Sequence, residues 1–424
     1  MLYDIREAQR AFLNPLSNWA DSMSRLYTNP YSPLAYSPFA RRISAGLELV
    51  HRLGKEYEKP EFAITSTKIE GREVPVVESV AIELPFCRLL KFERRLPRAL
   101  AHRGRDPVVL VFAPLSGHHA TLLRDTVRTL VADHVVYITD WTDARMVPMS
   151  QGPFHLDDYI AYAVQFLRHL GPDVHVLSVC QPTVPVLAAI SLMASIDDRH
   201  LPRTMTMMGG PIDTRRCPTE VNTLAQTHSH DWFERNVIYR VPARYPGAGR
   251  RVYPGFLQHA GFISMNADRH MHSHWEFYLS LVKGDLGDAA AHRRFYDEYN
   301  AVLDMPAEYY LDTIHTVFQE HALPRGTWNA RFEGALCRVD PSKIRNVALF
   351  TIEGELDDIS GAGQTQAAHD LCSSLPQAQK RHLTVEGAGH YGIFSGRRWR
   401  ERVYPEVREF IASHRAALLL RKVA

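Results

Sequence analysis

The chain has 424 residues, of which 45% are hydrophobic and 23% are charged. These proportions are ordinary for a globular protein with a large core, and they exclude disorder, collagen and coiled coil as whole-chain descriptions. The net charge of +2 arises from 49 basic and 47 acidic residues, so no global positive field would attract nucleic acid. At about 150 residues per domain, the length predicts two or three units.

The N-terminal region predicts a helix. Apolar side chains recur at near-helical spacing from Leu2 to Leu26, with Pro15 among them. Frequent charges exclude a secretory signal, and no run of about 18 apolar residues anywhere could span a membrane, so we expect a cytoplasmic protein. We expect residues 1–72 to be an extension packed on the core, with 29–42 extended. The alternative for residues 2–26 is a helix that lies on an apolar surface.

Residues 73–215 predict the first part of an α/β core. Two antiparallel strands are expected at 74–82 and 87–94. Buried strands then alternate with helices: strands at 108–113, 135–139, 174–179 and 204–208, and helices at 120–132, 156–170 and 183–195. The alternation resumes in residues 336–424, with strands at 347–352 and 382–385 and helices around 363–374 and at 398–419. This order predicts a mostly parallel, doubly wound sheet.

Residues 216–335 interrupt this alternation. The segment looks mainly helical, and it holds 18 of the 42 aromatic residues in 120 positions, or 15%, against 8% elsewhere. Such a segment is expected to be a lid with an apolar underside. A helical subdomain with an ordinary core of its own is the alternative, and both descriptions can hold together.

One of the five cysteines stands at a chemically informative position. Cys180, in Ser178-Val-Cys-Gln-Pro182, joins a predicted strand directly to a helix, where a nucleophile elbow projects its side chain above a sheet. Taken by itself, Cys180 would more often be a buried core cysteine. No CxxC pair occurs, so neither a disulfide framework nor a zinc knuckle is indicated.

Two further residues follow later strands. Asp357, in Gly354-Glu-Leu-Asp-Asp358, is favoured over Asp358 by its spacing from Gly354, and His390 stands on a glycine-rich loop after the last predicted strand. An Asp-rich turn and a surface histidine are the alternatives. The chain order Cys180, Asp357, His390 is nevertheless the nucleophile–acid–base order of α/β-hydrolases.

The sequence also resembles the intracellular polyhydroxyalkanoate (polyhydroxybutyrate, PHB) depolymerases. The matching stretches are 114–128, 178–187, 208–213, 251–259, 353–363 and 389–398. The resemblance implies an α/β-hydrolase fold with a helical lid, a Cys180–Asp357–His390 triad, and a storage polyester granule as the partner. The polyhydroxyalkanoate synthases are more distant relatives that share the triad.

The expected reaction is ester hydrolysis through a thioester on Cys180. The backbone N–H groups of Gln181 and of Leu115 or Ser116 are expected to form the oxyanion hole. No cofactor and no metal are expected, since the cluster His270-Met-His272-Ser-His274 has no clear further ligands. The alternatives are a synthase-like acyltransferase and a non-catalytic granule-binding protein. The substrate-binding residues and the oligomeric state, including a homodimer, stay open.

Overall fold

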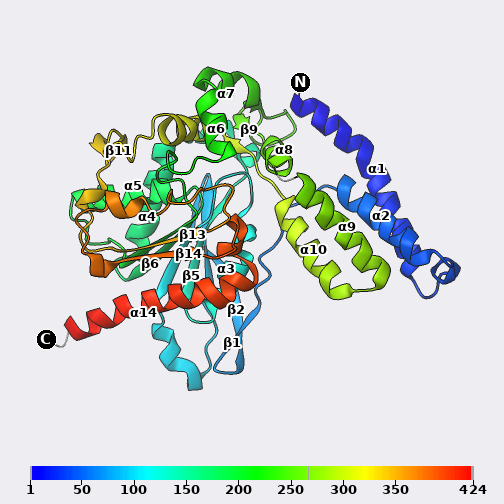
Figure 1. The fold of residues 1–424 in the computed structure, drawn as a ribbon, viewed down its shortest axis with the longest axis horizontal. Helices are drawn as coiled ribbons and strands as arrows, with labels where there is room; N and C mark the ends of the chain where they lie inside the picture. Colours follow the sequence, from blue (N-terminus) through cyan, green and yellow to red (C-terminus); the bar gives the residue numbers. More distant parts are fainter. Residues whose placement is uncertain (1, 266, 422–424) are drawn as a thin grey trace.

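A nine-stranded sheet forms the centre of the computed structural model, which describes residues 2–265 and 267–421 (Figure 1). In spatial order, its strands are β1 (Ser66–Ile69), β2 (Arg72–Leu84), β3 (Cys87–Arg94), β5 (Val135–Trp141), β4 (Val108–Phe112), β6 (Val174–Val179), β7 (Thr204–Met208), β13 (Ala348–Gly354) and β14 (Lys380–Val385). From β5 to β14 all neighbours are parallel, whereas β1, β2 and β3 pair antiparallel.

The parallel strands are buried on both faces, as their unbroken apolar runs predict. Alternate residues of β4 point to opposite sides: Leu110 and Phe112 belong to one core cluster, and Val109 and Val111 to another. The helices α4 (Leu156–Leu170) and α5 (Thr183–Ser195) cover the first side. The helices α3 (Arg124–Val131) and α14 (Tyr404–Arg421) cover the second. This doubly wound arrangement with an antiparallel edge is an α/β-hydrolase fold, as the sequence predicts.

One predicted helix of the core is mostly absent. Around 363–374 the chain forms a series of turns, and only α12 (Ala368–Leu371) is helical. The buried carboxylate of Glu353 accepts hydrogen bonds from the backbone N–H groups of Gly363, Thr365 and Gln366 at 2.8–2.9 Å. These amides belong to the first turn, where a helix offers them no internal partner, so the carboxylate fixes the start of the segment. The helix α12 ends with its C-cap at Cys372, whose ψ of 54° is not helical. The short helix α13 (Gly396–Arg398) precedes α14.

The segment between β7 and β13 is mainly helical. Its helices are α6 (Glu220–Thr227), α7 (His230–Val237), α8 (Gly255–Met265), α9 (Ala267–Lys283), α10 (Leu286–Tyr299) and α11 (Ala307–Thr313). Its strands are β8 (Tyr239–Arg240), β9 (Arg251–Tyr253) and β10 (Met305–Pro306) in one small sheet, and β11 (Asn329–Phe332) and β12 (Ala335–Arg338) in a hairpin. We call this segment the insertion.

The N-terminal region differs from the expectation in two ways. Helices α1 (Leu2–Thr28) and α2 (Ala40–Gly54) form a pair, and α2 begins where the Pro-rich stretch was expected to be extended. The pair lies beside α9 and α10 (Figure 1), and Tyr3 at the start of α1 is buried against Val241 and Val252 of the insertion. The reason is that α2 directs charged residues at the insertion: Glu48 binds Arg293, and Arg52 binds Asp297.

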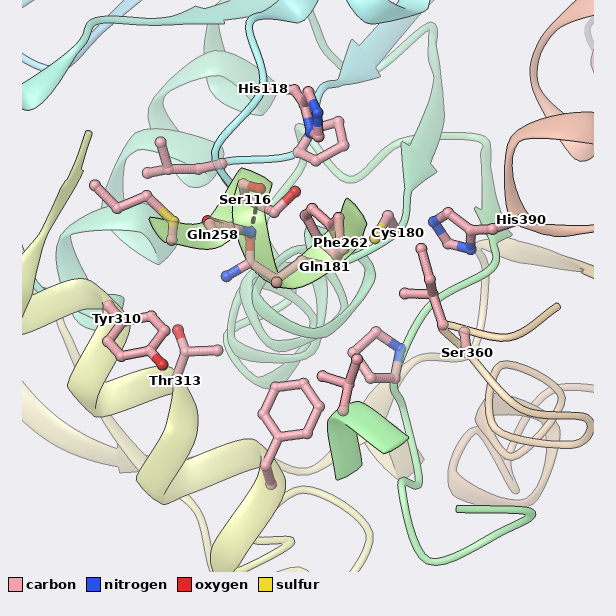
Figure 2. A pocket seen from close by; sticks show the side chains of 18 of the residues that line it. Ser116, His118, Cys180, Gln181, Gln258, Phe262, Tyr310, Thr313, Ser360 and His390 are labelled. Atoms are coloured by element: carbon pink, nitrogen blue, oxygen red, sulfur yellow. Dashed lines mark hydrogen bonds between the residues drawn. The ribbon is translucent and has the colours of Figure 1, made fainter. Parts of the chain in front are cut away.

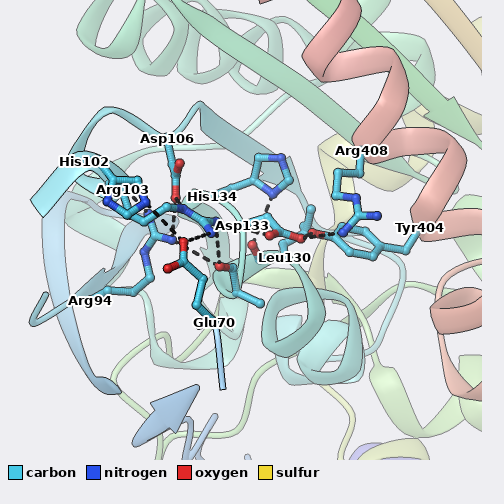
Figure 3. Close-up of polar contacts among 11 residues, drawn as sticks. Glu70, Arg94, His102, Arg103, Asp106, Leu130, Asp133, His134, Tyr404 and Arg408 are labelled. Atoms are coloured by element: carbon cyan, nitrogen blue, oxygen red, sulfur yellow. Dashed lines mark hydrogen bonds and ion pairs between the residues drawn. The ribbon is translucent and has the colours of Figure 1, made fainter. Parts of the chain in front are cut away.

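A polar network fastens the antiparallel edge of the sheet to the C-terminal helix (Figure 3). The guanidinium of Arg94, which is 2% exposed, lies 2.8 Å from Asp106. Arg103 links Asp106 to Asp133, and the Tyr404 hydroxyl donates to Asp133 over 2.6 Å. A buried guanidinium loses its hydration, so this pairing offsets a desolvation cost.

Candidate active site

Cys180 occupies the sharp turn between β6 and α5. Its φ is +66°, a left-handed backbone conformation that residues other than glycine rarely adopt. The turn is held on both sides: the Cys180 N–H donates to the Met208 carbonyl at 2.7 Å, and the Cys180 carbonyl accepts the Thr183 hydroxyl at 2.9 Å. Held strain at one residue is typical of functional sites, and the turn has the form of a nucleophile elbow.

The structure brings Asp357 and His390 together. Nδ1 of His390 lies 2.8 Å from Oδ2 of Asp357, and the side chains are 4% and 0% exposed. The other oxygen of Asp357 accepts the N–H groups of Ile359 and Ser360 at 2.9 and 2.8 Å. Asp358 is exposed. The geometry therefore places Asp357, and not its neighbour, against the imidazole.

The side chain of Cys180 lies beside this imidazole, as Figure 2 shows. Burial alone would lower the pKa of His390, but the charge of Asp357, the Cys180 thiolate and the hydrogen bonds with both groups raise it well above 6.5. A stabilised imidazolium is what an imidazole needs in order to accept a proton from a neighbouring thiol. The three residues can therefore act as a nucleophile, a base and an orienting acid.

Gly209 makes room for this pair. It follows β7 with a φ of +55°, and a Cβ built there would lie 3.1 Å from Cε1 of His390 and 3.3 Å from Oδ2 of Asp357. A larger residue would push against both partners at once. The tight packing shows that the positions of Asp357 and His390 depend on β7, a strand between those that carry Cys180 and Asp357.

The residues expected to form the oxyanion hole also line this site. Leu115 and Ser116 lie on the loop after β4, and Gln181 follows Cys180. Among the described residues, none of their N–H groups donates to a backbone carbonyl, so all three can serve a ligand. A side chain from the insertion holds the loop: Nε2 of Gln258 donates to the Ser116 carbonyl.

Cys180, His390 and the three backbone positions line one cavity of about 420 Å³, while Asp357 lies behind His390 and outside the lining. Its walls come from both the core and the insertion, as Figure 2 shows for Cys180, His390, Gln258 and Tyr310. The insertion contributes mainly apolar groups, among them Leu224, Phe233, Tyr253, Phe262, Tyr310 and Phe318. An apolar cavity with few polar groups suits a ligand made largely of hydrocarbon and esters.

Sequence reasoning missed Gln258, Tyr310 and Thr313 as lining residues. The aromatic content of 216–335 indicates that the segment covers something apolar, but no motif marks which side chains face the cavity. That depends on how α8 and α11 pack over the sheet, a contact between distant parts of the chain.

The other candidate groups lie apart from this chemistry. Burial raises the pKa of Cys372 to about 12 and that of Cys87 well above 9.0, which makes both poor nucleophiles. His270, His272 and His274 lie on helix α9 and not on a strand, so His272 cannot share a face with the other two. Within the described ranges, no group of three or more His, Cys, Asp or Glu side chains could hold a metal.

Comparison with known family models finds a match to part of the chain. Residues 209–415 match the family model described as PHB de-polymerase C-terminus. This match, which covers just under half of the chain, supports a PHB depolymerase of the α/β-hydrolase superfamily. The domain contains the insertion, Asp357 and His390, whereas Cys180 precedes it. No curated protein matches the chain. In the described ranges, no helix combines the length and the hydropathy needed to cross a bilayer.

Several solved structures resemble this chain at low identity. Paleococcus ferrophilus monoacylglycerol lipase has 12% identity and a TM-score of 0.42, covering 72% of this chain and 94% of its own. A structure from a study of Nitrososphaera gargenis carboxylesterases has 10% identity and a TM-score of 0.43, covering 81% and 100%. The Rhodococcus 2-hydroxy-6-oxo-6-phenylhexa-2,4-dienoate hydrolase has 11% identity and a TM-score of 0.41, and the match covers 80% of this chain and 99% of the hydrolase. The fold assignment rests on the chain's own strand order.

Proposed function

We propose that the protein hydrolyses the ester bonds of polyhydroxyalkanoate, in particular poly-3-hydroxybutyrate, with Cys180 as the nucleophile. The observation that carries the proposal is the buried Asp357–His390 pair beside the strained Cys180, with Cys180 and His390 facing an apolar cavity in a chain that contains a PHB depolymerase domain. The family indicates the polymer, and the side chains indicate how its ester is attacked.

In the first half of the reaction, His390 takes the thiol proton of Cys180, and the sulfur attacks the ester carbonyl. Asp357 stabilises the resulting imidazolium. The negative oxygen accepts hydrogen bonds from the N–H groups of Gln181 and of Leu115 or Ser116. The carbon–oxygen bond then breaks, His390 protonates the departing 3-hydroxyl, and a thioester remains on Cys180.

In the second half, His390 removes a proton from water, which attacks the thioester carbonyl. The carbon–sulfur bond breaks, the thiolate recovers its proton, and a free carboxylic acid leaves. No cofactor enters either half. Because a thioester can also pass its acyl group to an alcohol, the same site would support a synthase-like acyltransferase, and only the acceptor distinguishes the two.

We also place the protein in the cytoplasm, at the surface of polyester storage granules. Cys180 works only as a free thiol, and a reducing compartment preserves it. In keeping with this, all five cysteines, each within the described ranges, are unpaired.

The test is Cys180→Ala assayed on amorphous poly-3-hydroxybutyrate particles, with release of acid as the readout. We expect hydrolysis to fall to background while the variant still sediments with the particles. Retained hydrolysis by the variant would exclude Cys180 as the nucleophile. If the parent protein itself released no acid, a purely binding role would be indicated. Growth of polymer from 3-hydroxybutyryl-coenzyme A without hydrolysis would assign the acyltransferase instead.

A further inference from the structure

The helical pair α1–α2 exposes its apolar side chains to solvent. In α1, Phe12 is 80% exposed, Leu16 48% and Trp19 54%, and their spacing places them on one stripe of the helix. Helix α2 and the residue before it add a second stripe, formed by Phe39, Ile43, Val50 and Leu53, which are 39–67% exposed. Monomeric soluble proteins rarely leave contiguous apolar surface uncovered, so a partner is indicated.

The contact between the two helices is made of small and polar residues. Ser24 and Ser44 share a hydrogen bond of 3.0 Å between their hydroxyls, and the Ser17 hydroxyl donates to the His51 carbonyl at 3.0 Å. Ala20 is fully buried in the same face of α1. A helical pair in water normally buries its apolar side chains at the contact and exposes its polar ones, whereas this pair does the opposite. Small residues and hydroxyl bonds at the contact are typical of helices in an apolar medium.

Both stripes lie on one side of the pair. The hydrogen bonds of Ser17 with His51 and of Ser24 with Ser44 show that the helices run antiparallel. At about 100° per residue, the apolar stripe of each helix lies roughly a quarter turn around the helix axis from the face that contacts the other helix. The direction of this turn is the same in both helices when each is viewed from its N-terminus. In an antiparallel pair, equal offsets of this kind point the same way. The opposite flank of α2 is occupied, because Glu48 and Arg52 bind residues of α10 there.

The charges indicate which partner fits. None of the residues named for the two stripes is ionisable, and α1 balances three acidic residues against three basic ones. In α2, Arg52 and Glu48 are bound to α10, which leaves two exposed arginines, Arg41 and Arg42, beside the second stripe. A helix that binds anionic lipid carries an excess of Lys and Arg on its polar face. The surface therefore suits an uncharged apolar phase better than a charged bilayer.

From these observations we infer that the α1–α2 pair is the surface by which the protein docks on its solid, uncharged polyester. The inference rests on the proposed function for the identity of the polymer. The pair is attached to the part of the molecule that forms the cavity: α2 packs on α9, and α9 follows directly on α8, which lines the cavity with Gly261 and Phe262. Docking there keeps the cavity close to the polymer that it must receive.

The test compares two full-length variants. In the first, Phe12, Leu16 and Trp19 are each changed to Gln, a residue that favours helices. The matched control changes Met149, Ile196 and Leu336 to Gln, which are 54%, 49% and 73% exposed but lie elsewhere on the body. Each is measured for sedimentation with amorphous poly-3-hydroxybutyrate particles and for hydrolysis of a soluble short-chain ester, p-nitrophenyl butyrate.

We expect the first variant to bind particles at least about tenfold more weakly, because three large apolar side chains lose their burial, while soluble-ester hydrolysis and the control stay unchanged. Equal binding by the first variant would overturn the inference, as would an equal loss in the control. The inference would also be overturned if the parent protein bound neutral phosphatidylcholine vesicles but not the polymer particles. The same holds if sedimentation velocity showed that the stripe only joins two copies of the protein. Cys180→Ala separates the two proposals, since it tests hydrolysis and leaves docking intact.

Discussion

Asp357 accepts hydrogen bonds through both of its oxygens, and one of the donors is Nδ1 of His390 at 2.8 Å. The two residues stand on loops after neighbouring strands, β13 and β14. Because the backbone fixes Oδ1, only Oδ2 is free to orient the imidazole. This division of tasks leads to the first prediction.

Asp357→Asn should reduce kcat by a factor of about 10³–10⁴, because the amide cannot stabilise the imidazolium and favours the wrong tautomer. The measurement is kcat on a soluble 3-hydroxybutyrate ester, with circular dichroism to check the fold. Asp358→Asn is the control, since Asp358 is exposed and stands one residue away. An equal loss in both variants would mean that the loop, and not the carboxylate, is responsible.

The pH profile should follow the imidazole. Burial lowers the pKa of His390, but the charge of Asp357 outweighs this effect, so the pKa lies well above 6.5. The neutral imidazole is the base, so kcat/KM should rise with pH through an inflection above 6.5 that belongs to the coupled Cys180–His390 pair. Asp357→Asn should move that inflection to lower pH. An unmoved inflection would separate the pH dependence from this pair.

The same shift affects stability with the opposite sign. A histidine whose pKa rises on folding stabilises the protein fully below 6.5, and this contribution is lost as the pH rises through the folded-state pKa. His390→Gln should therefore flatten the fall of the free energy of unfolding across this window, measured in urea at several pH values. A variant that retains the full slope would contradict the assignment.

Gln258→Ala should lower kcat about tenfold with little change in KM, because the loop with Leu115 and Ser116 loses the hydrogen bond to the Ser116 carbonyl. Gln319→Ala is the control, since this insertion glutamine also donates to carbonyls, those of Ala225 and His228, away from that loop. We expect kcat of the control to equal that of the parent. A change confined to KM would assign Gln258 to substrate binding instead.

Asp106→Ala should destabilise the protein by about 3 kcal/mol, because it leaves the buried Arg94 guanidinium without its carboxylate. The exposed pair of Arg203 and Asp173 provides the comparison. Asp173→Ala should cost less than about 1 kcal/mol, since water already solvates both groups. Denaturant unfolding of the two variants measures the difference, and equal losses would show that burial of Arg94 does not matter.

Much of the core could be predicted from local patterns. The helices at 156–170 and 183–195 and the strands at 174–179 and 204–208 agree with the structure residue for residue. Each is an apolar run or a helical stripe whose burial requires only that the sheet be covered on both faces. The order of Cys180, Asp357 and His390 along these elements likewise follows from the sequence, because parallel strands place their carboxyl ends at one edge.

The tertiary structure decided what depends on distant contacts. The carboxylate of Glu353 binds amides at the start of the 363–374 segment, and Gln258 reaches the Ser116 carbonyl from 142 residues away. The apolar stripe of Phe12, Leu16 and Trp19 is visible in the sequence, but which way it faces is not. Periodicity determines that a helix has an apolar side; only the contacts of the folded chain determine whether that side lies inside or meets solvent.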